Sequence, residues 1–302
     1  MFQLVILLIA LFAGYQIKRL YIPQLLLNKV LFIIVIVILV VMGYQFGSSA
    51  SDLWLQLLQV LKNVVVFASL IFICNILLTM LFFRQANQQL RHPEHEQIQA
   101  NYAQFAYESG KYLAMIALGI CVGYLLKLPL VHLEAIVNWL LIILLFIIGH
   151  QMRMNGVSLK EVLLNKTGFK LSCVIVIASL VAGGLSAVIL GMPIMQGIAL
   201  SSGFGWYTLS SILIGQLINQ DYGTTAFFID FSRELIAIIL LPSLGRFIPL
   251  SMVGYCGATA MDFSLPIIKQ NLDHKCVIIA ISSGMLLSCA VPLLIPLVIK
   301  FI

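Results

Sequence analysis

The stretch VLFIIVIVILVVMGYQF, residues 30–46, contains no charged side chain. As an α-helix that rises about 1.5 Å per residue, it would reach most of the way across the roughly 30 Å hydrocarbon core of a bilayer. Apolar and polar residues do not alternate with a period of two, so nothing indicates the strand of a transmembrane barrel. The stretch therefore predicts a membrane-spanning helix in an all-α membrane protein.

The composition of the whole chain supports this interpretation. Of 302 residues, 62% are apolar and only 9% are charged, whereas soluble proteins carry about 25% charged residues. Such a chain cannot cover its surface with polar groups, so we expect membrane lipids around it. The net charge of +6 comes from lysines and arginines scattered singly between apolar runs, which excludes a nucleic-acid partner. No Walker motif, catalytic triad, metal cluster or dinucleotide fingerprint is present, so we expect neither an enzyme nor a cofactor.

Eight segments are long and apolar enough to be predicted as spans. They are residues 2–17, 30–46, 63–83, 112–127, 134–149, 171–191, 224–244 and 276–299. Residues 192–217 and 247–268 are also long enough, but glycine and polar residues interrupt them.

Positive charge in the loops predicts the orientation. The loops after the first, third and fifth spans hold Lys18, Arg19, Lys29, Arg84, Arg91, Lys111, Arg153, Lys160, Lys166 and Lys170. The loops after the second and fourth spans hold only Lys62 and Lys127, and the loop after the sixth holds none. Cytoplasmic loops carry the excess of Lys and Arg, so we expect both termini in the periplasm.

The two halves of the first 191 residues resemble each other. Gly14-Tyr15 matches Gly123-Tyr124, and Gly43-Tyr44-Gln45 matches Gly149-His150-Gln151. Each unit has three spans, an odd number, so the two units would be inverted relative to each other. Inverted repeats are typical of alternating-access transporters. The expected organisation is a first three-span repeat (1–83), a cytoplasmic linker (84–111), a second, inverted three-span repeat (112–191) and a broken-helix substrate and ion region (192–302).

The last region holds a weaker duplication, in which residues 201–216 and 255–270 each precede an apolar span. If both leading elements cross the membrane, the chain has ten spans. If both are re-entrant hairpins, it has eight spans plus two hairpins. The positive charges differ between these arrangements only by Arg246. Irregular backbone at membrane depth is tolerated where it lines a cavity, which favours the hairpins.

Three charged residues, Asp230, Arg233 and Glu234, lie near the centre of the span 224–244. An ionised group at mid-bilayer costs about 2.5–3.5 kcal/mol on insertion scales, so such residues usually have a function. Positions 230 and 234 are one helical turn apart and share a face. Asp230 and Arg233 could form an internal ion pair that only fixes packing. One arginine cannot neutralise two carboxylates, so one remains available for a cation or a proton.

The interrupted elements supply the other candidate residues for binding a substrate or an ion. Asp262 follows a glycine-containing stretch, and a carboxylate on a broken helix suits an ammonium group, although it could instead cap a helix. Aromatic faces can hold a cation, and hydroxyls can hold the α-carboxylate or α-amine of an amino acid. From these two elements we select Gly203, Gly205, Trp206, Tyr207, Thr208, Ser210, Ser211, Gly257, Thr259 and Asp262.

Four motifs resemble the bacterial lysine exporter (LysO) family: GHQMRMNGVSLKEVLLNKTG (149–168), SGFGWYTLS (202–210), DFSRELIAIILLP (230–242) and CGATAMDFSLP (256–266). The resemblance runs from the first span to the last and is strongest from about residue 112. It implies export of L-lysine and toxic lysine analogues across the bacterial inner membrane. It also implies that Glu234 and Asp262 are needed for export, and that eight spans leave both termini periplasmic.

Lysine carries a charge of +1, and an inside-negative potential opposes its exit by about 2.3 kcal/mol per 100 mV. We therefore expect a secondary exporter that exchanges L-lysine for H⁺ or Na⁺. Its partner could be a second copy of the chain, in a homodimer. The alternatives are a transporter of arginine, ornithine or an organic anion, and a channel or membrane sensor.

Overall fold

A computed structural model describes residues 2–17, 23–49, 53–90, 102–127, 133–154 and 165–302. Throughout this part of the chain the regular secondary structure is helical. The elements are α1 (Phe2–Gln16), α2 (Gln24–Ser49), α3 (Leu53–Phe82), α4 (Arg84–Gln89), α5 (Tyr102–Leu126), α6 (Leu133–Met154), α8 (Lys166–Leu190), α9 (Ile194–Leu200), α10 (Tyr207–Leu217), α11 (Gln220–Leu244), α12 (Pro249–Cys256), η1 (Gly257–Met261), α13 (Leu265–Asn271) and α14 (His274–Ile299).

Each predicted span falls largely within one of these helices. Among the described residues, four helical stretches have the length and hydropathy to cross a membrane: Lys29–Ser48, Leu53–Phe82, Lys166–Leu190 and His274–Ile299. Two shorter apolar stretches are Gly110–Leu126 and Trp139–His150. Helix α11 is also long, but its acidic and basic residues lower its hydropathy. Parts of the predicted linker and of the 149–168 motif, residues 91–101 and 155–164, lie outside the described residues.

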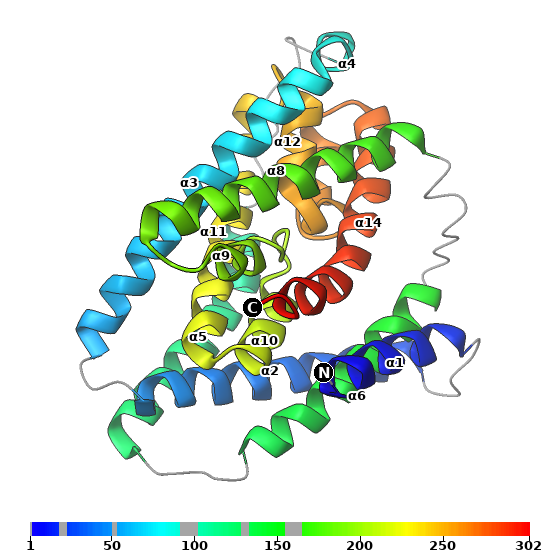
Figure 1. The fold of residues 1–302 in the computed structure, drawn as a ribbon. Helices are drawn as coiled ribbons and strands as arrows, with labels where there is room; N and C mark the ends of the chain where they lie inside the picture. Colours follow the sequence, from blue (N-terminus) through cyan, green and yellow to red (C-terminus); the bar gives the residue numbers. More distant parts are fainter. Residues whose placement is uncertain (1, 18–22, 50–52, 91–101, 128–132, 155–164) are drawn as a thin grey trace.

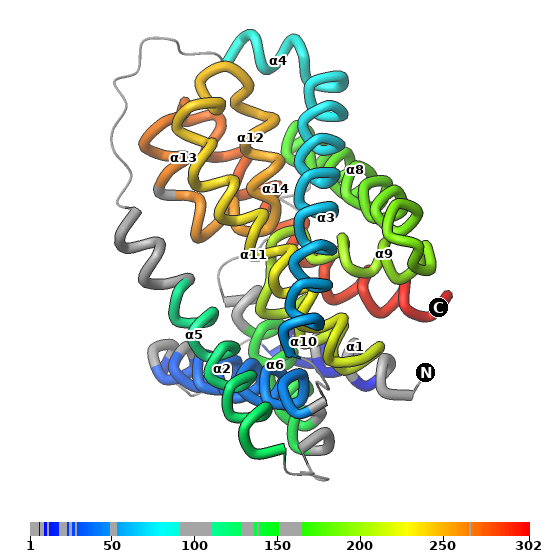
Figure 2. The backbone as a smooth tube through the Cα atoms, turned by 90° about the vertical axis from the view of Figure 1, so that its left-hand side faces the viewer, coloured from blue at the N-terminus to red at the C-terminus, as the bar shows by residue number. Residues whose placement is uncertain are grey.

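The helices form two groups (Figures 1 and 2). Helices α1, α2, α5 and α6 gather on one side of the molecule, where α1 packs on α6 and α2 packs on both α5 and α6. Glycines let these helices approach closely. A Cβ atom on Gly119 would lie 2.3 Å from the Val40 carbonyl oxygen, and one on Gly14 would lie 2.0 Å from the Phe146 carbonyl oxygen. In lipid no hydrophobic effect drives helices together. Small residues at the contact favour association because they let the backbones pack closely.

The second group is built on α3, α8, α11 and α14. Helix α3 packs against α8, α11 packs on α3, and α14 packs on α8. The broken elements, α9–α10 and α12–α13, all pack on α11 and α14 (Figures 1 and 2). Helix α4, within the predicted linker, is tied to this group, because the side chain of Asn87 accepts a hydrogen bond from the Leu250 amide (2.8 Å) and donates one to Ser251 (3.1 Å).

In both interrupted elements the helix is broken at glycine residues. We call residues 201–206, between α9 and α10, the first break, and residues 257–264, between α12 and α13, the second break. Gly205 has a φ of 91° and Gly257 a φ of 67°, a region of backbone space that glycine adopts most readily. The two breaks meet through their main chains, since the Ala258 amide donates to the Phe204 carbonyl oxygen at 2.9 Å.

The ends of each broken element lie close together. The Tyr222 hydroxyl, in the first turn of α11, donates a hydrogen bond to the side chain of Gln196, in the first turn of α9. Similarly, Gly245 follows α11 and packs against Leu272, just ahead of α14. Each element thus returns toward the end of the helix bundle at which it began.

Candidate functional site

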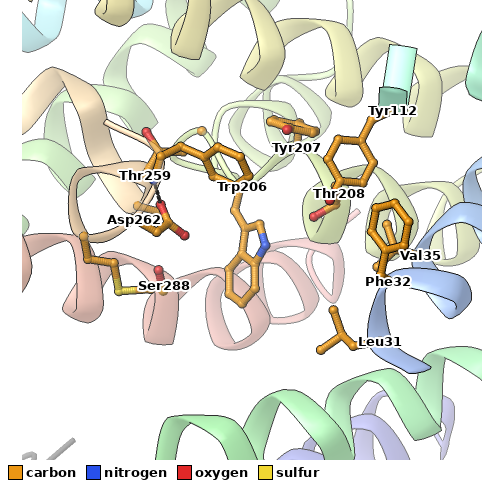
Figure 3. Close-up of a pocket in the computed structure, with 14 residues that line it drawn as sticks. Leu31, Phe32, Val35, Tyr112, Trp206, Tyr207, Thr208, Thr259, Asp262 and Ser288 are labelled. Carbon is orange, nitrogen blue, oxygen red and sulfur yellow. Dashed lines mark hydrogen bonds between the residues drawn. The ribbon is translucent and has the colours of Figure 1, made fainter. Parts of the chain in front are cut away.

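A cavity of about 540 Å³ lies where the two breaks meet α14 and the inner faces of α2 and α5 (Figure 3). We call it the binding cavity. It is lined by Leu31, Phe32, Val35, Tyr112, Gly205, Trp206, Tyr207, Thr208, Ala258, Thr259, Met261, Asp262, Phe263 and Ser288.

Asp262 is the carboxylate in this lining, and its side chain is open to the cavity. It follows η1, where its own amide donates to the Thr259 carbonyl oxygen at 3.1 Å. The Phe263 amide donates to its Oδ1 atom at 2.6 Å. This bond fixes one oxygen, while the exposed carboxylate can still receive donors from a ligand. The local chain therefore presents a negative charge to the binding cavity.

Trp206 divides the binding cavity. In Figure 3 its indole extends between Asp262 and Ser288 on one side and Thr208 and Tyr112 on the other. Trp206 immediately precedes α10, and its amide donates to the Gly203 carbonyl oxygen at 2.9 Å. The ring is partly exposed, so it offers a face to a cation beside Asp262.

Aromatic rings form the wall opposite Asp262. The ring of Tyr207 is edge-on to those of Tyr112 (5.8 Å between centroids), Phe227 (5.2 Å) and Phe231 (5.7 Å). Tyr112 in turn contacts Phe32 edge-on at 6.0 Å. Such contacts are favourable ring geometries, and here they join α10 and α11 to α5 and α2 across the two helix groups.

Asp230 lies behind the cavity and holds the first break. Its side chain is 1% exposed. Its Oδ1 accepts the Gly205 amide at 2.8 Å, and its Oδ2 accepts the Ser210 hydroxyl. Space is so limited that a Cβ atom on Gly203 would lie 1.7 Å from Oδ2. Asp230 is thus a fixed acceptor that fastens the break to α11.

Arg233 holds the end of α12, immediately before the second break. It is fully buried; its Nε donates to the Tyr255 carbonyl oxygen at 2.9 Å, and its Nη1 donates to Ser179 at 3.3 Å. Its guanidinium also lies 5.4 Å from the centre of the Tyr255 ring. Asp230 and Arg233 are thus each bonded to other groups, not joined as the simple ion pair considered from the sequence. Asp230 thus fastens the first break to α11, and Arg233 fastens to α11 the end of α12 that leads into the second break.

The structure divides the residues selected from the sequence into two sets. Gly205, Trp206, Tyr207, Thr208, Thr259 and Asp262 line the binding cavity. The others are buried and lie outside its lining: Gly203, Ser210, Ser211, Asp230, Arg233, Glu234 and Gly257.

Several lining residues were missed by sequence reasoning. Ser288 lies one turn after Gly284, and a Cβ atom on Gly284 would be 2.7 Å from the Met261 amide nitrogen. The Gly-x-x-x-Ser spacing was therefore a usable signal that α14 meets the second break. Phe32 and Tyr112 belong to apolar helices and gave no such signal.

The two neighbouring serines of α10 provide a matched test of the role of Asp230. Removing Ser210 takes a donor from a buried carboxylate, which costs about 1.5–3 kcal/mol, whereas a neutral bond contributes about 0.5–1.5 kcal/mol. Ser211 donates only to the Thr208 carbonyl oxygen, at 3.3 Å. We expect Ser210→Ala to lower the thermal unfolding midpoint of the detergent-solubilised protein more than Ser211→Ala does. Equal shifts would contradict the role given to Asp230.

Comparison with known proteins identifies the family. Residues 113–299 match the family described as "Lysine exporter LysO". Over 293 residues the chain is 36% identical to "Lysine exporter LysO" of Escherichia coli, an alignment that covers 97% of each chain. The chain belongs to the LysO family. It is also 42% identical over 182 residues to the Haemophilus influenzae protein named "Putative lysine exporter", covering 60% of this chain and 93% of that protein. No solved structure matches the chain.

Membership of the LysO family makes this chain a transporter and not an enzyme. It also makes it a multi-pass membrane protein of a bacterial exporter family, in agreement with the apolar helices described above.

Proposed function

We propose that this chain is a secondary active exporter of L-lysine and lysine analogues across the bacterial inner membrane. The observation that carries the proposal is the open carboxylate of Asp262 in a cavity formed by two helix breaks. Broken helices are where many secondary transporters bind their substrates. The lysine named for the relatives supplies the identity of the cation.

The geometry suggests how lysine is held. The side-chain ammonium lies beside Asp262, with the Trp206 indole as a cation–π partner that contributes about 0.5–2 kcal/mol. The amino-acid end meets the hydroxyl of Thr208, on the other side of the indole, whereas the Ser288 hydroxyl lies on the Asp262 side and donates to the Gly284 carbonyl oxygen at 2.9 Å. Ser210 and Ser211, selected from the sequence for that role, instead donate inside the protein, Ser210 to Asp230 and Ser211 to the Thr208 carbonyl oxygen.

Exchange for an incoming H⁺ or Na⁺ would offset the electrical cost of lysine export. The membrane potential adds about 2.3 kcal/mol per 100 mV to the exit of one positive charge. A carboxylate can bind either the substrate ammonium or the coupling ion, but not both at once. The binding of one therefore requires the release of the other. Asp262 is the open carboxylate, and Glu234 is a buried carboxylate one turn from Asp230 on α11. We assign the coupling ion to this pair.

The proposed arrangement in the membrane is eight spans and two re-entrant elements, with both termini periplasmic. The contacts of Tyr222 with Gln196 and of Gly245 with Leu272 support the re-entrant elements, because the chain leaves and returns at one end of the bundle. The inverted repeat is supported by reciprocal packing of matched segments, α1 on α6 and α5 on α2.

The test is efflux of labelled lysine from proteoliposomes, with and without an imposed pH or Na⁺ gradient. We expect saturable efflux that one of the gradients stimulates and that unlabelled lysine inhibits more than arginine, ornithine or an organic anion does. Flux that is weakly saturable and indifferent to both gradients would indicate a channel. No lysine movement by folded protein would refute the proposed function.

A further inference from the structure

A second cavity, of about 350 Å³, lies at the N-terminal ends of α3 and α11 and the C-terminal end of α8. Its polar lining comes from two helices, Gln56, Gln59 and Asn63 on α3 and Asp221, Tyr222 and Thr225 on α11. This polar cluster played no part in the function proposed above.

The first break separates the second cavity from the binding cavity. Leu200, just before the break, lines the second cavity, and Gly205, within it, lines the binding cavity. Helix α2 borders both, with Val35 at the binding cavity and Phe46 at the second. Eleven helical positions correspond to about 16 Å. The two cavities thus meet α2 about three turns apart, and the first break lies between the residues Leu200 and Gly205 that line them.

Asp221 gives the second cavity its charge. Its side chain is open, and its Oδ1 accepts a hydrogen bond from Gln56 Nε2 at 3.2 Å. In the described part of the chain, no lysine or arginine lies within ion-pair distance of it. Asp221 precedes the predicted span 224–244, and partial burial raises the pKa of its carboxyl while the Gln56 bond opposes that rise. A cationic ligand would offset the cost of keeping this group charged.

The other groups suit an amino acid better than a bare ion. The side-chain amides of Gln59 and Asn63 can donate to a carboxylate, and the volume leaves room for an organic molecule with water.

We propose that the second cavity is a release site for the exported amino-acid cation, with a primary ammonium bound at Asp221 and the carboxylate among the amides of α3. This inference rests on the proposed function. In the proposed orientation, the end of α8 and the beginnings of α3 and α11 face the periplasm. The substrate would then leave Asp262, pass the first break and occupy this site before it enters bulk water.

The experiment measures lysine exchange by the full-length protein in liposomes of phosphatidylcholine and phosphatidylglycerol, which carry no primary amine. The half-saturating lysine concentration is determined separately at each membrane face, with a C-terminal tag reporting orientation. We expect Asp221→Asn to raise this concentration at least fivefold at the face of the second cavity and less than twofold at the other. The matched control is Asp273→Asn, because Asp273 caps α14 and lines neither cavity; it should change neither value.

The possible results separate this inference from the proposed function. If wild type moves no lysine, both fail. If wild type exchanges lysine and Asp221→Asn leaves both faces unchanged, or raises both equally, only the release site is refuted. If the asymmetric effect requires phosphatidylethanolamine in the bilayer, the ammonium at Asp221 belongs to a lipid headgroup, and the release site is again refuted.

Discussion

Asp262→Asn should reduce gradient-driven lysine efflux about 30-fold or more. Asparagine keeps the shape of the side chain and can still accept the Phe263 amide, so the local fold should survive. What is lost is the negative charge facing the binding cavity. Removing one partner of a charge pair that the bound substrate desolvates costs about 2–5 kcal/mol, and each 1.4 kcal/mol is a factor of ten. The measurement is initial efflux rate in proteoliposomes, at equal amounts of inserted protein.

The control for Asp262→Asn is again Asp273→Asn. Asn is as good an N-cap as Asp, so this variant removes the same charge with little structural cost and should transport at the wild-type rate. Unfolding midpoints of both variants should stay close to wild type. Efflux by Asp262→Asn within a few-fold of wild type would refute the assignment of the substrate ammonium to this residue.

Gly257→Ala should destabilise the protein and abolish most transport. Gly257 has φ and ψ of 67° and −133°, a region essentially restricted to glycine, where another residue costs about 1–3 kcal/mol. In addition, the new Cβ atom would lie 2.1 Å from the Phe204 carbonyl oxygen, a main-chain atom that cannot rotate away. Overpacking of this kind costs about another 1–3 kcal/mol. We expect a lower unfolding midpoint and at least a tenfold loss of efflux.

Gly184→Ala is the matched control for Gly257→Ala. Gly184 lies within α8, and the nearest atom to a Cβ there would be at 3.9 Å. Alanine is favoured over glycine in a helix by about 1 kcal/mol, so the midpoint should stay or rise and efflux should be unchanged. If both glycine variants behaved alike, the contact between the two breaks would not be needed for function.

The helical elements could be predicted because the bilayer restricts which secondary structures can span it. A stretch such as 30–46 has few alternatives to a spanning helix. Asp262 and Glu234 could be selected since charge is costly in lipid, and Gly205 and Gly257 marked the places where the helices break. These inferences depend on local composition, so a single sequence contains them.

The arrangement of the site depended on contacts distant in sequence. Nothing local indicates that Ala258 bonds to Phe204, or that Tyr112 reaches the cavity from a helix that reads as lipid-facing. Asp230 was grouped with Glu234 as a binding residue because both lie on one face of a span; its partners, Gly205 and Ser210, make it part of the support instead. Periodicity along a helix predicts a shared face, but it does not predict what that face meets.

The bond between Ala258 and Phe204 uses main-chain atoms only, so side chains around it can change without removing its donor or its acceptor. In this contact, position 257 must be glycine, because of its backbone conformation and its closeness to the Phe204 carbonyl oxygen. Residues that would touch the substrate, such as Trp206, Thr208 and Ser288, are separate from that requirement. Homologues could therefore diverge in the cation they export by exchanging cavity side chains, while the junction that creates the cavity is inherited unchanged.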